Sequence, residues 1–479
     1  MADHHRSRTT GDHLVTDGFD TVLPPDRAVE QLRDALGGER VITEPDLMES
    51  YRWDQTAAIT PGHPAAVVRA TDVPDVVTTL RWATEHRVPV VPRGAGTSLT
   101  GGAAAIDGCI VLSLAGMNRI VELSPAERLA VVQPGVVNAD LDRAARVHGL
   151  MYAPDPASYE ISTIGGNLAT NAGGLRCLKY GVTRDAALGL EVVLAEGTVI
   201  STGRRTVKGV VGYDLTGLFV GSEGTLGVIT SAVLRLRPAP SQPPLTVSAT
   251  FDSLQAAARA VTEVMRAGID TCLLELMDRT TLESIDQWKN IGLEATTQAM
   301  LISQCDGPAQ VSAGSQVARC FEGAGATEVA LSSDEIESQQ LLELRRMSYP
   351  AMERLGACLV EDVCVPITAL ASMVERIEAI ADRYGVLIPT VGHAGDGNLH
   401  PVFIYEHGST EPPAPVWDAA DEVFRAALAL GGTITGEHGV GALKSRWVAD
   451  ELDPDTLTAH RTVKSAFDPL HILNPGRGL

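Results

Sequence analysis

Four residues in the last quarter of the chain carry side chains suited to metal binding and proton transfer. His393 and His400 lie in "HAGDGNLH", while Glu437 and His438 lie between glycines in "TGEHGVGALK". Two imidazoles and one carboxylate are a common ligand set for a divalent ion, with Zn²⁺ a plausible occupant. A neutral imidazole beside such a site can accept a proton near pH 7. The alternative is that the two histidines are unrelated, one capping a turn and the other satisfied within a sheet.

The local sequence around His393 and His400 favours a hairpin over a helix. A spacing of seven would put both on one helix face, but the three glycines and the proline of "VGHAGDGNLHP" disfavour a helix. Asp396-Gly397 is a favoured centre for a two-residue hairpin turn. Such a turn would pair His393 directly with His400, with Cβ atoms about 5 Å apart. A wider loop could also bring the two side chains together.

Three segments in the first half are rich in glycine, threonine and asparagine and poor in charge. They are "PRGAGTSLTGG" (92–102), "PDPASYEISTIGGNLATNAGGLRCLKYG" (154–181) and "GYDLTGLFVGSEGTLGVIT" (212–230). Exposed backbone N–H groups and small hydroxyls can hold phosphate oxygens. None of the segments has Walker or Rossmann spacing. Together they predict one large, polar ligand that carries phosphate.

In this order, the segments resemble the FAD-binding domain of the vanillyl-alcohol oxidase/PCMH flavoprotein superfamily. The second half resembles its D-2-hydroxyacid dehydrogenase branch, the glycolate oxidase D-subunit, D-lactate dehydrogenase and D-2-hydroxyglutarate dehydrogenase type, and the resemblance runs from about Pro24 to the C-terminus. Relatives with covalent FAD often carry a histidine in the first loop, where this chain has Thr97, so we expect non-covalent FAD. The FAD contacts that the resemblance implies are Pro92, Arg93, Gly94, Ala95, Gly96, Thr97, Ser98, Pro156, Ser158, Gly165, Gly166, Asn167, Thr170, Asn171, Gly173, Gly174, Gly224, Val228, Ile229 and Asn474.

The resemblance also assigns roles to the residues of the opening paragraph. It implies that His393, His400 and Glu437 bind a divalent metal, with Zn²⁺ expected first and Mn²⁺ or Fe²⁺ as alternatives, and that His438 is the general base. Arg345 would hold the substrate carboxylate, because a guanidinium fork matches a carboxylate. The neighbouring Arg346 is interpreted as a surface charge. The reaction implied is hydride transfer from C2 of a D-2-hydroxyacid to flavin N5.

Two departures from the family pattern bear on the substrate. The 2-hydroxyglutarate branch would carry a lysine a few residues before the proline of "EDVCVP" and an asparagine two positions after the second histidine. This chain has apolar residues there, around Val360 and at Val402. We therefore expect a small or apolar-tailed hydroxyacid, D-lactate or glycolate, with D-2-hydroxyglutarate or another 2-hydroxyacid as the alternative.

Other functions are open on the same residues. An alkyl-dihydroxyacetone-phosphate synthase-like flavoenzyme would share the fold, but no segment indicates a channel for a long-chain substrate. A flavin-free metallohydrolase could use the same histidines and glutamate, although the three glycine-rich segments argue against it. A flavin subunit without catalysis of its own is a further alternative. The electron acceptor is open among quinone, cytochrome, a partner flavoprotein and O₂, whereas the lack of a Rossmann fingerprint disfavours a nicotinamide.

Composition narrows the class of partner. The chain has 479 residues and a formal net charge of -22, which disfavours nucleic acid and anionic membranes as general partners. Its seven cysteines include no CxxC pair, as is typical of a reduced cytoplasmic protein. The sequence indicates neither a secretory signal nor a membrane span. We expect a cytoplasmic protein, with peripheral membrane attachment left open, that is a homodimer or a subunit of a complex.

The order of elements predicts an α+β fold with two domains, a tail and a C-terminal segment. They are a tail (1–21), a two-part PCMH-type FAD-binding domain (22–238), a substrate or cap domain with an antiparallel sheet (239–440), and a C-terminal segment that returns to the flavin (441–479). The proline-rich "RPAPSQPP" (237–244) marks the main boundary. Apolar spacing and caps predict helices at 26–36 and about 74–87. We expect the cap helices on one face of its sheet.

Overall fold

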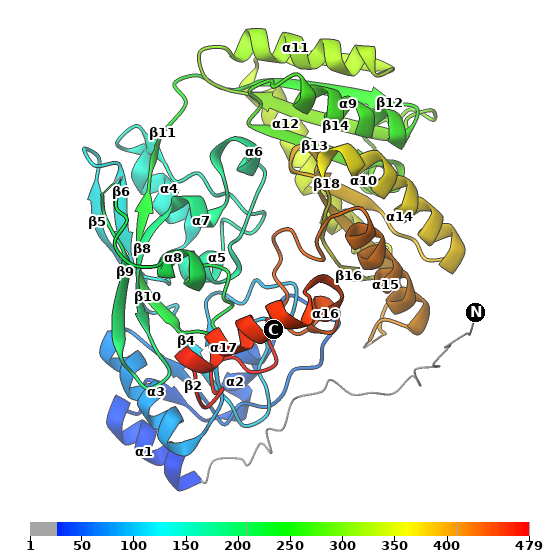
Figure 1. Cartoon of the computed structure of the whole chain (residues 1–479). Helices are drawn as coiled ribbons and strands as arrows, with labels where there is room; N and C mark the ends of the chain where they lie inside the picture. The colour runs from blue at the N-terminus through cyan, green and yellow to red at the C-terminus, as the bar shows by residue number, and fades with distance from the viewer. Residues whose placement is uncertain (1–25, 207, 410, 479) are drawn as a thin grey trace.

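The computed structural model describes residues 26–206, 208–409 and 411–478, so the predicted tail of residues 1–21 lies outside the described part. Figure 1 shows an N-terminal half, coloured blue to green, to the left of and below a second half coloured green to orange, and the red helix α17 returns to the first half. Helices and antiparallel sheets occur together, which confirms the predicted α+β class. Among the described residues, no helix has both the length and the apolar character needed to cross a bilayer.

The first sheet is small and is built from four short strands rich in apolar residues. Its order is β1-β2-β4-β3, with β4 parallel to both β2 and β3. Asp72 caps α3 by accepting the N–H of Asp75, and Arg87 ends the helix in a left-handed conformation. The elements are α1 (Asp26–Leu36), β1 (Val41–Ile42), α2 (Pro45–Arg52), β2 (Ala66–Arg69), α3 (Val73–His86), β3 (Val90–Arg93) and β4 (Ile110–Ser113). The two predicted helices therefore match α1 and α3 to within a residue.

The second sheet is antiparallel and follows the order β5-β6-β10-β8-β9. Its alternating apolar residues pack against α4, α5 and α8. The second glycine-rich segment contains the short helices α5 and α6, and α7 follows directly after it. The elements are β5 (Ile120–Ser124), β6 (Leu129–Val132), α4 (Asn138–Arg146), β7 (Leu150–Met151), α5 (Ile164–Thr170), α6 (Cys177–Tyr180), α7 (Thr183–Ala186), β8 (Ala187–Val193), β9 (Val199–Gly203), α8 (Leu215–Phe219), β10 (Val228–Arg235) and β11 (Arg237–Pro238), which pairs with β7.

The second half is built on an eight-stranded sheet of order β15-β12-β14-β13-β18-β19-β16, with β17 also paired to β19. Every pairing in this sheet is antiparallel, as predicted. The elements are β12 (Leu245–Phe251), α9 (Leu254–Arg266), β13 (Leu273–Asp278), α10 (Arg279–Lys289), β14 (Ala299–Cys305), α11 (Gln310–Gly323), β15 (Glu328–Ser332), α12 (Glu335–Arg346), α13 (Ser348–Met352), β16 (Ala357–Val360), β17 (Val363–Cys364), η1 (Ile367–Ala369), α14 (Leu370–Tyr384), β18 (Thr390–His393), η2 (Ala394–Asp396), β19 (Asn398–Tyr405) and α15 (Ala414–Ala429).

Helices cover both faces of this sheet, so the prediction that they lie on one face was wrong. Leu276 of β13 joins the core formed with α9, α11, α14 and α15, whereas its neighbour Met277 joins a second core with α10, α12 and α13. An apolar stripe along a helix indicates that the helix is packed against the protein core, but it does not indicate which face of the sheet the helix covers. Val391 and Val402 belong to the second core, so the alternation of side chains turns His393 and His400 toward that same face.

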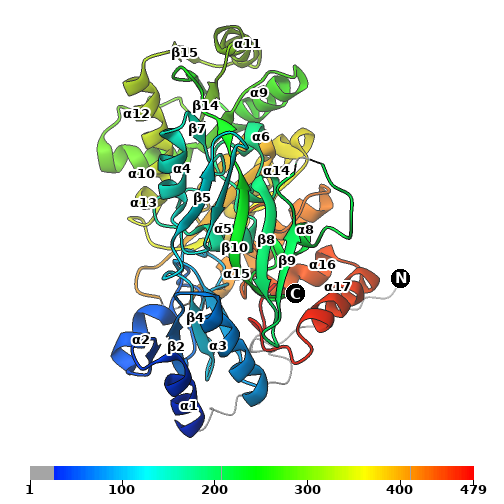
Figure 2. The same ribbon diagram turned by 90° about the vertical axis from the view of Figure 1, so that its left-hand side faces the viewer.

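The C-terminal segment contains η3 (Ser445–Trp447), α16 (Val448–Glu451) and α17 (Pro454–Phe467), and it packs on the N-terminal half (Figure 2). Phe467 meets Phe219 of α8 edge to face at 5.3 Å between ring centroids. Leu473 forms a parallel bridge with Val90 of β3. The last residues of the chain therefore lie beside the first glycine-rich loop.

Candidate active site

His393 and His400 lie on a hairpin, but its register differs from the predicted one. His393 ends β18 and pairs with Asn398, while His400 of β19 pairs with Val391. The predicted two-residue turn was wrong because Ala394–Asp396 form a 3₁₀ turn that Gly397 closes with φ +75°. The histidines are consequently diagonal neighbours on one sheet face, with ring centroids 5.1 Å apart.

Glu437 meets both imidazoles at one point. Its Oε1 lies 3.2 Å from Nε2 of His393 and 3.2 Å from Nε2 of His400, and all three side chains are largely buried. One ligand atom from each residue falls within 4.8 Å of the other two. Burial alone would raise the pKa of Glu437, but the two histidines hold it well below its usual range. This donor set and its convergence fit a divalent ion.

The other face of His393 is held by a buried carboxylate that the sequence interpretation missed. Nδ1 of His393 lies 2.7 Å from Oε1 of Glu275, which is fully buried on β13. Metal-binding histidines usually bond a carboxylate or carbonyl through their second nitrogen, and Glu275 supplies that contact. A lone glutamate in the apolar strand "CLLELM" was the available signal, but nothing in the sequence showed that this strand lies next to β18.

Arg345 is the second partner of Glu275. Its Nε lies 2.8 Å from Oε2 of Glu275, and its side chain is 12% exposed. Arg345, which was predicted to hold the substrate carboxylate, is thus linked to His393 through its ion pair with Glu275. Arg346 instead pairs with the exposed Glu343 on the surface of α12.

His438 faces the same point from another loop. Its ring stacks on His400 at 4.9 Å between centroids and an interplanar angle of 15°. Nε2 lies 3.9 Å from Oε1 of Glu437, on the side of the proposed metal ligands. Burial, with the nearby His400, lowers the pKa of His438 to about 4 despite Asp362. The imidazole is therefore neutral near pH 7, as a proton acceptor must be.

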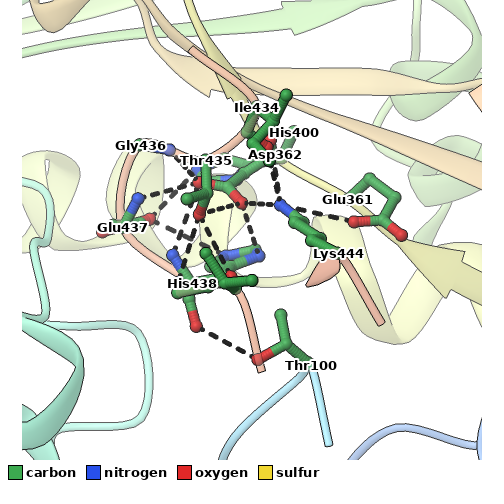
Figure 3. Close-up of polar contacts among 12 residues, drawn as sticks. Thr100, Glu361, Asp362, His400, Ile434, Thr435, Gly436, Glu437, His438 and Lys444 are labelled. Atoms are coloured by element: carbon green, nitrogen blue, oxygen red, sulfur yellow. Dashed lines mark hydrogen bonds and ion pairs between the residues drawn. The ribbon is translucent and has the colours of Figure 1, made fainter. Parts of the chain in front are cut away.

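A buried cluster of Glu361, Asp362 and Lys444 supports the loop that carries Glu437 and His438 (Figure 3). All three side chains are inaccessible to solvent. The carboxylate of Asp362 accepts backbone N–H groups from Gly436 at 2.5 Å and from Glu437 at 2.8 Å. Sequence reasoning treated "EDVCVP" only as an apolar run before a proline, so it missed this cluster although two adjacent acids in such a run were visible.

The first and second glycine-rich segments contact each other where FAD was predicted. A Cβ on Gly94 would lie 2.4 Å from Oγ1 of Thr163, the residue that caps α5. Arg93 beneath the loop is buried and donates to the carbonyl of Ala103. The negative charge of Asp54 partly offsets the cost of burying the Arg93 guanidinium. Asp54 was not among the predicted site residues. Of the remaining predicted residues of this loop, Gly96 is buried, Ala95 is exposed, and Pro92, Thr97 and Ser98 are half-buried.

The second segment also borders the histidine site. A Cβ on Gly173 would lie 2.5 Å from Oε2 of Glu437, so backbone of this segment lies directly against the carboxylate. Nδ2 of the buried Asn167 has no hydrogen-bond partner among the described residues, which leaves a donor for a ligand. Asn171 ends α5 in a left-handed conformation. The other predicted residues of this segment, spread from the turn before α5 to the loop after it, are Pro156, Ser158, Gly165, Gly166, Thr170 and Gly174.

The third segment and the C-terminus complete the enclosure of the first loop. A Cβ on Gly224 would lie 3.1 Å from Cγ of Pro92, and the predicted residues Val228 and Ile229 follow on β10. Nδ2 of Asn474 donates to the carbonyls of Gly102 and Glu223, while its Oδ1 is buried with no partner in the described part of the chain. The free donor of Asn167 and this free acceptor fit a ligand with both kinds of polar group, as FAD has.

Glu223, which was not among the predicted site residues, connects the third glycine-rich segment to the loop that carries Glu437 and His438. Its carboxylate accepts the N–H groups of Val440 at 2.8 Å and Gly441 at 2.7 Å, just after His438. The residue itself has φ +52°, within the third glycine-rich segment. The predicted cofactor segments and the loop of Glu437 are thus joined by direct hydrogen bonds.

Comparison with known proteins identifies two family domains in the chain. Residues 64–203 match the "FAD binding domain" family, and residues 242–477 match "FAD linked oxidases, C-terminal domain". Glycolate oxidase subunit GlcD of Bacillus subtilis (strain 168) is 44% identical over 418 residues, which cover 86% of this chain and 88% of that protein. A D-lactate dehydrogenase of Archaeoglobus fulgidus is 36% identical and covers 90% of this chain and 95% of its own length.

Solved structures share the fold at low sequence identity. p-Cresol methylhydroxylase with substrate bound has a TM-score of 0.78 at 21% identity, covering 95% of this chain and 96% of that one. An alkyldihydroxyacetonephosphate synthase has a TM-score of 0.72 at 17% identity, covering 94% and 85%. Together with the two matched domains, these likenesses confirm the predicted PCMH-type flavoprotein fold.

Proposed function

The chain belongs to the FAD-linked oxidases, and from that premise we propose that it oxidises a small D-2-hydroxyacid, D-lactate or glycolate, to the corresponding 2-oxoacid. It is an FAD-linked oxidoreductase that acts on 2-hydroxyacids, as are the relatives named glycolate oxidase subunit and D-lactate dehydrogenase. The observation that carries the finer proposal is the convergence of His393, His400 and Glu437 beside Gly173.

A divalent metal would be held by His393, His400 and Glu437. Both Nε2 atoms already approach Oε1 of Glu437, and Glu275 fixes His393 from behind. A metal there would lower the pKa of the substrate hydroxyl and stabilise the developing alkoxide. Zn²⁺ suits two imidazoles and one carboxylate, and Mn²⁺ or Fe²⁺ are alternatives.

His438 would take the proton of the substrate hydroxyl. Its ring stacks on His400, burial lowers its pKa to about 4, and its Nε2 faces the ligand cluster. FAD, when bound, supplies the redox chemistry by accepting the hydrogen and electron pair of substrate C2. His438 would only accept the substrate proton, at its Nε2 atom.

Arg345 would orient the substrate carboxylate. Its pair with Glu275 uses Nε, so the donors at its two Nη atoms can meet a second carboxylate. Because Glu275 also contacts His393, the clamp and the metal ligand are held in fixed relation. This arrangement suits a substrate whose carboxylate and hydroxyl lie on adjacent carbons.

The choice of a small or apolar-tailed substrate is supported by Val360 and Val402. These residues pair across β16 and β19, and Val402 lies on the same strand face as His400. Both pack in the apolar core with Met277 and Val391. A distal carboxylate would meet no cation from these two positions, which disfavours 2-hydroxyglutarate.

Anaerobic reduction of the flavin by a panel of substrates tests this proposal. The purified protein is expected to be yellow and to bleach with D-lactate or glycolate, and much more slowly with L-lactate or D-2-hydroxyglutarate. Preferred bleaching by D-2-hydroxyglutarate would overturn the substrate assignment. Colourless protein with hydrolase activity would favour the flavin-free metallohydrolase, and yellow protein that no hydroxyacid bleaches would favour a non-catalytic subunit.

Metal analysis tests the ligand assignment separately. Purified wild-type protein should contain about one equivalent of divalent metal per chain, because the three ligands define one site. If the active protein contains no metal, the two histidines must contact substrate directly. The likeness to alkyldihydroxyacetonephosphate synthase, at 17% identity, concerns the fold alone and supports no transferase activity.

A further inference from the structure

The two nitrogens of His438 have different surroundings. Nε2 points toward Glu437, 3.9 Å from Oε1, where the substrate hydroxyl would lie. Nδ1 points away from the site and is 3.6 Å from Oδ1 of Asp362. This nitrogen is buried and has no hydrogen-bond partner within the described residues. Asp362 is thus the acidic group that faces the rear of the ring.

Asp362 is itself held at both oxygens. Oδ2 accepts the N–H groups of Gly436 and Glu437, the residues directly before His438. Oδ1 accepts the hydroxyl of Thr435 at 3.0 Å and the ammonium of Lys444. A carboxylate fixed in this way cannot turn away from the imidazole without breaking several hydrogen bonds (Figure 3).

Lys444 balances the negative charge of Asp362 inside the protein. Its Nζ also donates to the carbonyls of Asp362 and Ile434, each at 3.1 Å, and lies 3.3 Å from Oε2 of Glu361. Glu361 and Asp362 lie between β16 and β17, and Lys444 lies in the segment after α15. The cluster therefore joins this part of the sheet to the loop that carries Glu437 and His438.

We propose that Asp362 is the positioning residue of His438, an inference that rests on the proposed role of His438 as base. Asp362 keeps the proton of the neutral ring on Nδ1, so that the lone pair of Nε2 faces the substrate. When the substrate O–H bond breaks and an N–H bond forms at Nε2, the carboxylate stabilises the imidazolium and takes no proton itself. The C2 hydrogen leaves with its electron pair to FAD, the oxidant of the proposed reaction. The 3.6 Å separation shortens when the ring gains charge, since such contacts are often long before substrate binds.

A purely structural role for Asp362 is the competing explanation. The residue then only anchors the loop, and its loss would reduce metal and FAD content together with activity. A positioning role predicts a selective loss of the rate of flavin reduction, with substrate affinity retained. It also predicts that the effect of changing Asp362 depends on His438, because residues that act as a unit are not additive.

The test is a double-mutant cycle on the full-length FAD-loaded protein. Asp362→Asn, His438→Ala and the double variant are compared with wild type in stopped-flow flavin reduction by D-lactate or glycolate, whichever bleaches wild type faster. Metal content, FAD content and melting temperature are measured for each. Asp75→Asn is the matched control, because Asp75 of α3 is also a buried aspartate that accepts a backbone N–H group and pairs with a cation, Arg40, in the N-terminal half. Asp362→Glu, which keeps the charge opposite Lys444, replaces Asp362→Asn if that variant fails to retain FAD.

The expected result is a fall of about 10²–10⁴-fold in the rate constant for Asp362→Asn, the usual range for general-base catalysis, at nearly unchanged substrate affinity. In the His438→Ala background the same change should cost less than about threefold. An equal cost in both backgrounds, or a wild-type rate for Asp362→Asn while His438→Ala is slow, would overturn the inference. A wild-type rate for His438→Ala would overturn the proposed base, and Asp362 with it.

Discussion

The two halves of the molecule prepare for their ligands by different means. The N-terminal half offers backbone and small side chains from segments such as 92–102 and 154–181, with few charges. The second half gathers ionisable side chains and buries them, so that Glu275 and Lys444 have no solvent exposure. The first arrangement depends on the absence of side-chain volume, whereas the second depends on exact pairing of charges.

This difference determines how each half should fail. Removing one buried charge leaves its partner without a counter-ion in the protein interior. This destabilises the folded state, and the effect is confined to the residues of that ion-pair network. Adding volume to a glycine displaces backbone and blocks a ligand without disturbing charges elsewhere. Variants in one half should therefore leave the ligand of the other half bound, and this separation is what the following experiments test.

The largest effect is expected for Glu437→Ala. The change removes the atom that both imidazoles approach, so metal should be lost and flavin reduction should fall by about 10³-fold, because the metal's contribution is several kcal/mol. FAD content should stay at the wild-type level. Metal analysis, absorbance and stopped-flow reduction measure the three quantities. Glu343→Ala, at an exposed glutamate, is the control, and joint loss of FAD and metal from Glu437→Ala would show that the halves are not separable.

Gly165→Val tests the other half. An added Cβ would lie 2.5 Å from Cβ of Pro134 and 3.0 Å from its carbonyl oxygen, so the backbone before α5 must shift. Overpacking of this kind costs about 1–3 kcal/mol, which weakens FAD binding about 5- to 150-fold if the whole cost falls on the cofactor site. Metal content should be unchanged. Gly323→Ala is the control, since a Cβ there meets no atom within 4 Å, and full FAD occupancy in Gly165→Val would refute the assignment.

The same contrast explains how far the sequence could predict the structure. Sites built from contiguous glycine-rich segments can be recognised in the sequence, and the three segments do contact one another. Helix caps such as Asp72 are local, so α1 and α3 could be bounded closely. The histidine pair was predictable as a hairpin but not in register, because a 3₁₀ turn at Ala394–Asp396 replaced the expected tight turn.

Residues that act across the sheet could not be predicted in the same way. Glu275 reaches His393 only because β13 pairs with β18, although the two lie more than a hundred residues apart. Asp362 binds the loop of Glu437 through backbone groups, and backbone N–H groups leave no signature in a sequence. The signal in both cases was an acid within an apolar run, which indicates a buried partner but does not identify it.

Glu275→Gln sharpens the comparison inside the second half. The amide keeps the size of the side chain but loses the charge that faces His393 and Arg345. Loss of such an outer contact typically weakens metal binding about 10–100-fold, so we expect that range in a competition titration with a chelator. FAD should be retained. Glu283→Gln on the surface of α10 is the control, and unchanged metal affinity in Glu275→Gln would mean that His393 is oriented by other contacts.

The smallest effect concerns the pH dependence of stability at Glu361. Burial raises the pKa of this carboxyl to about 7 against the opposing pull of Lys444, and both of its oxygens lack hydrogen-bond partners within the described residues. A carboxyl whose pKa is raised on folding favours the folded state fully below its ordinary pKa of 4.5, and this contribution is lost as the pH rises through 7. Wild-type protein should therefore lose about 1.4 kcal/mol of stability between about pH 6 and pH 8 through this group alone.

Glu361→Gln removes that titration while keeping a neutral side chain of the same shape. The melting temperature of the variant should approach that of wild type at pH 6 and exceed it at pH 8, so the difference between the two proteins grows with pH. Glu343→Gln, at an exposed position, should show no such trend. A constant difference across this window would mean that Glu361 keeps one protonation state beside Lys444. Because the glycine-rich segments carry few titrating groups, a pH-dependent difference that tracks Glu361 places this pH sensitivity in the charged cluster of the second half.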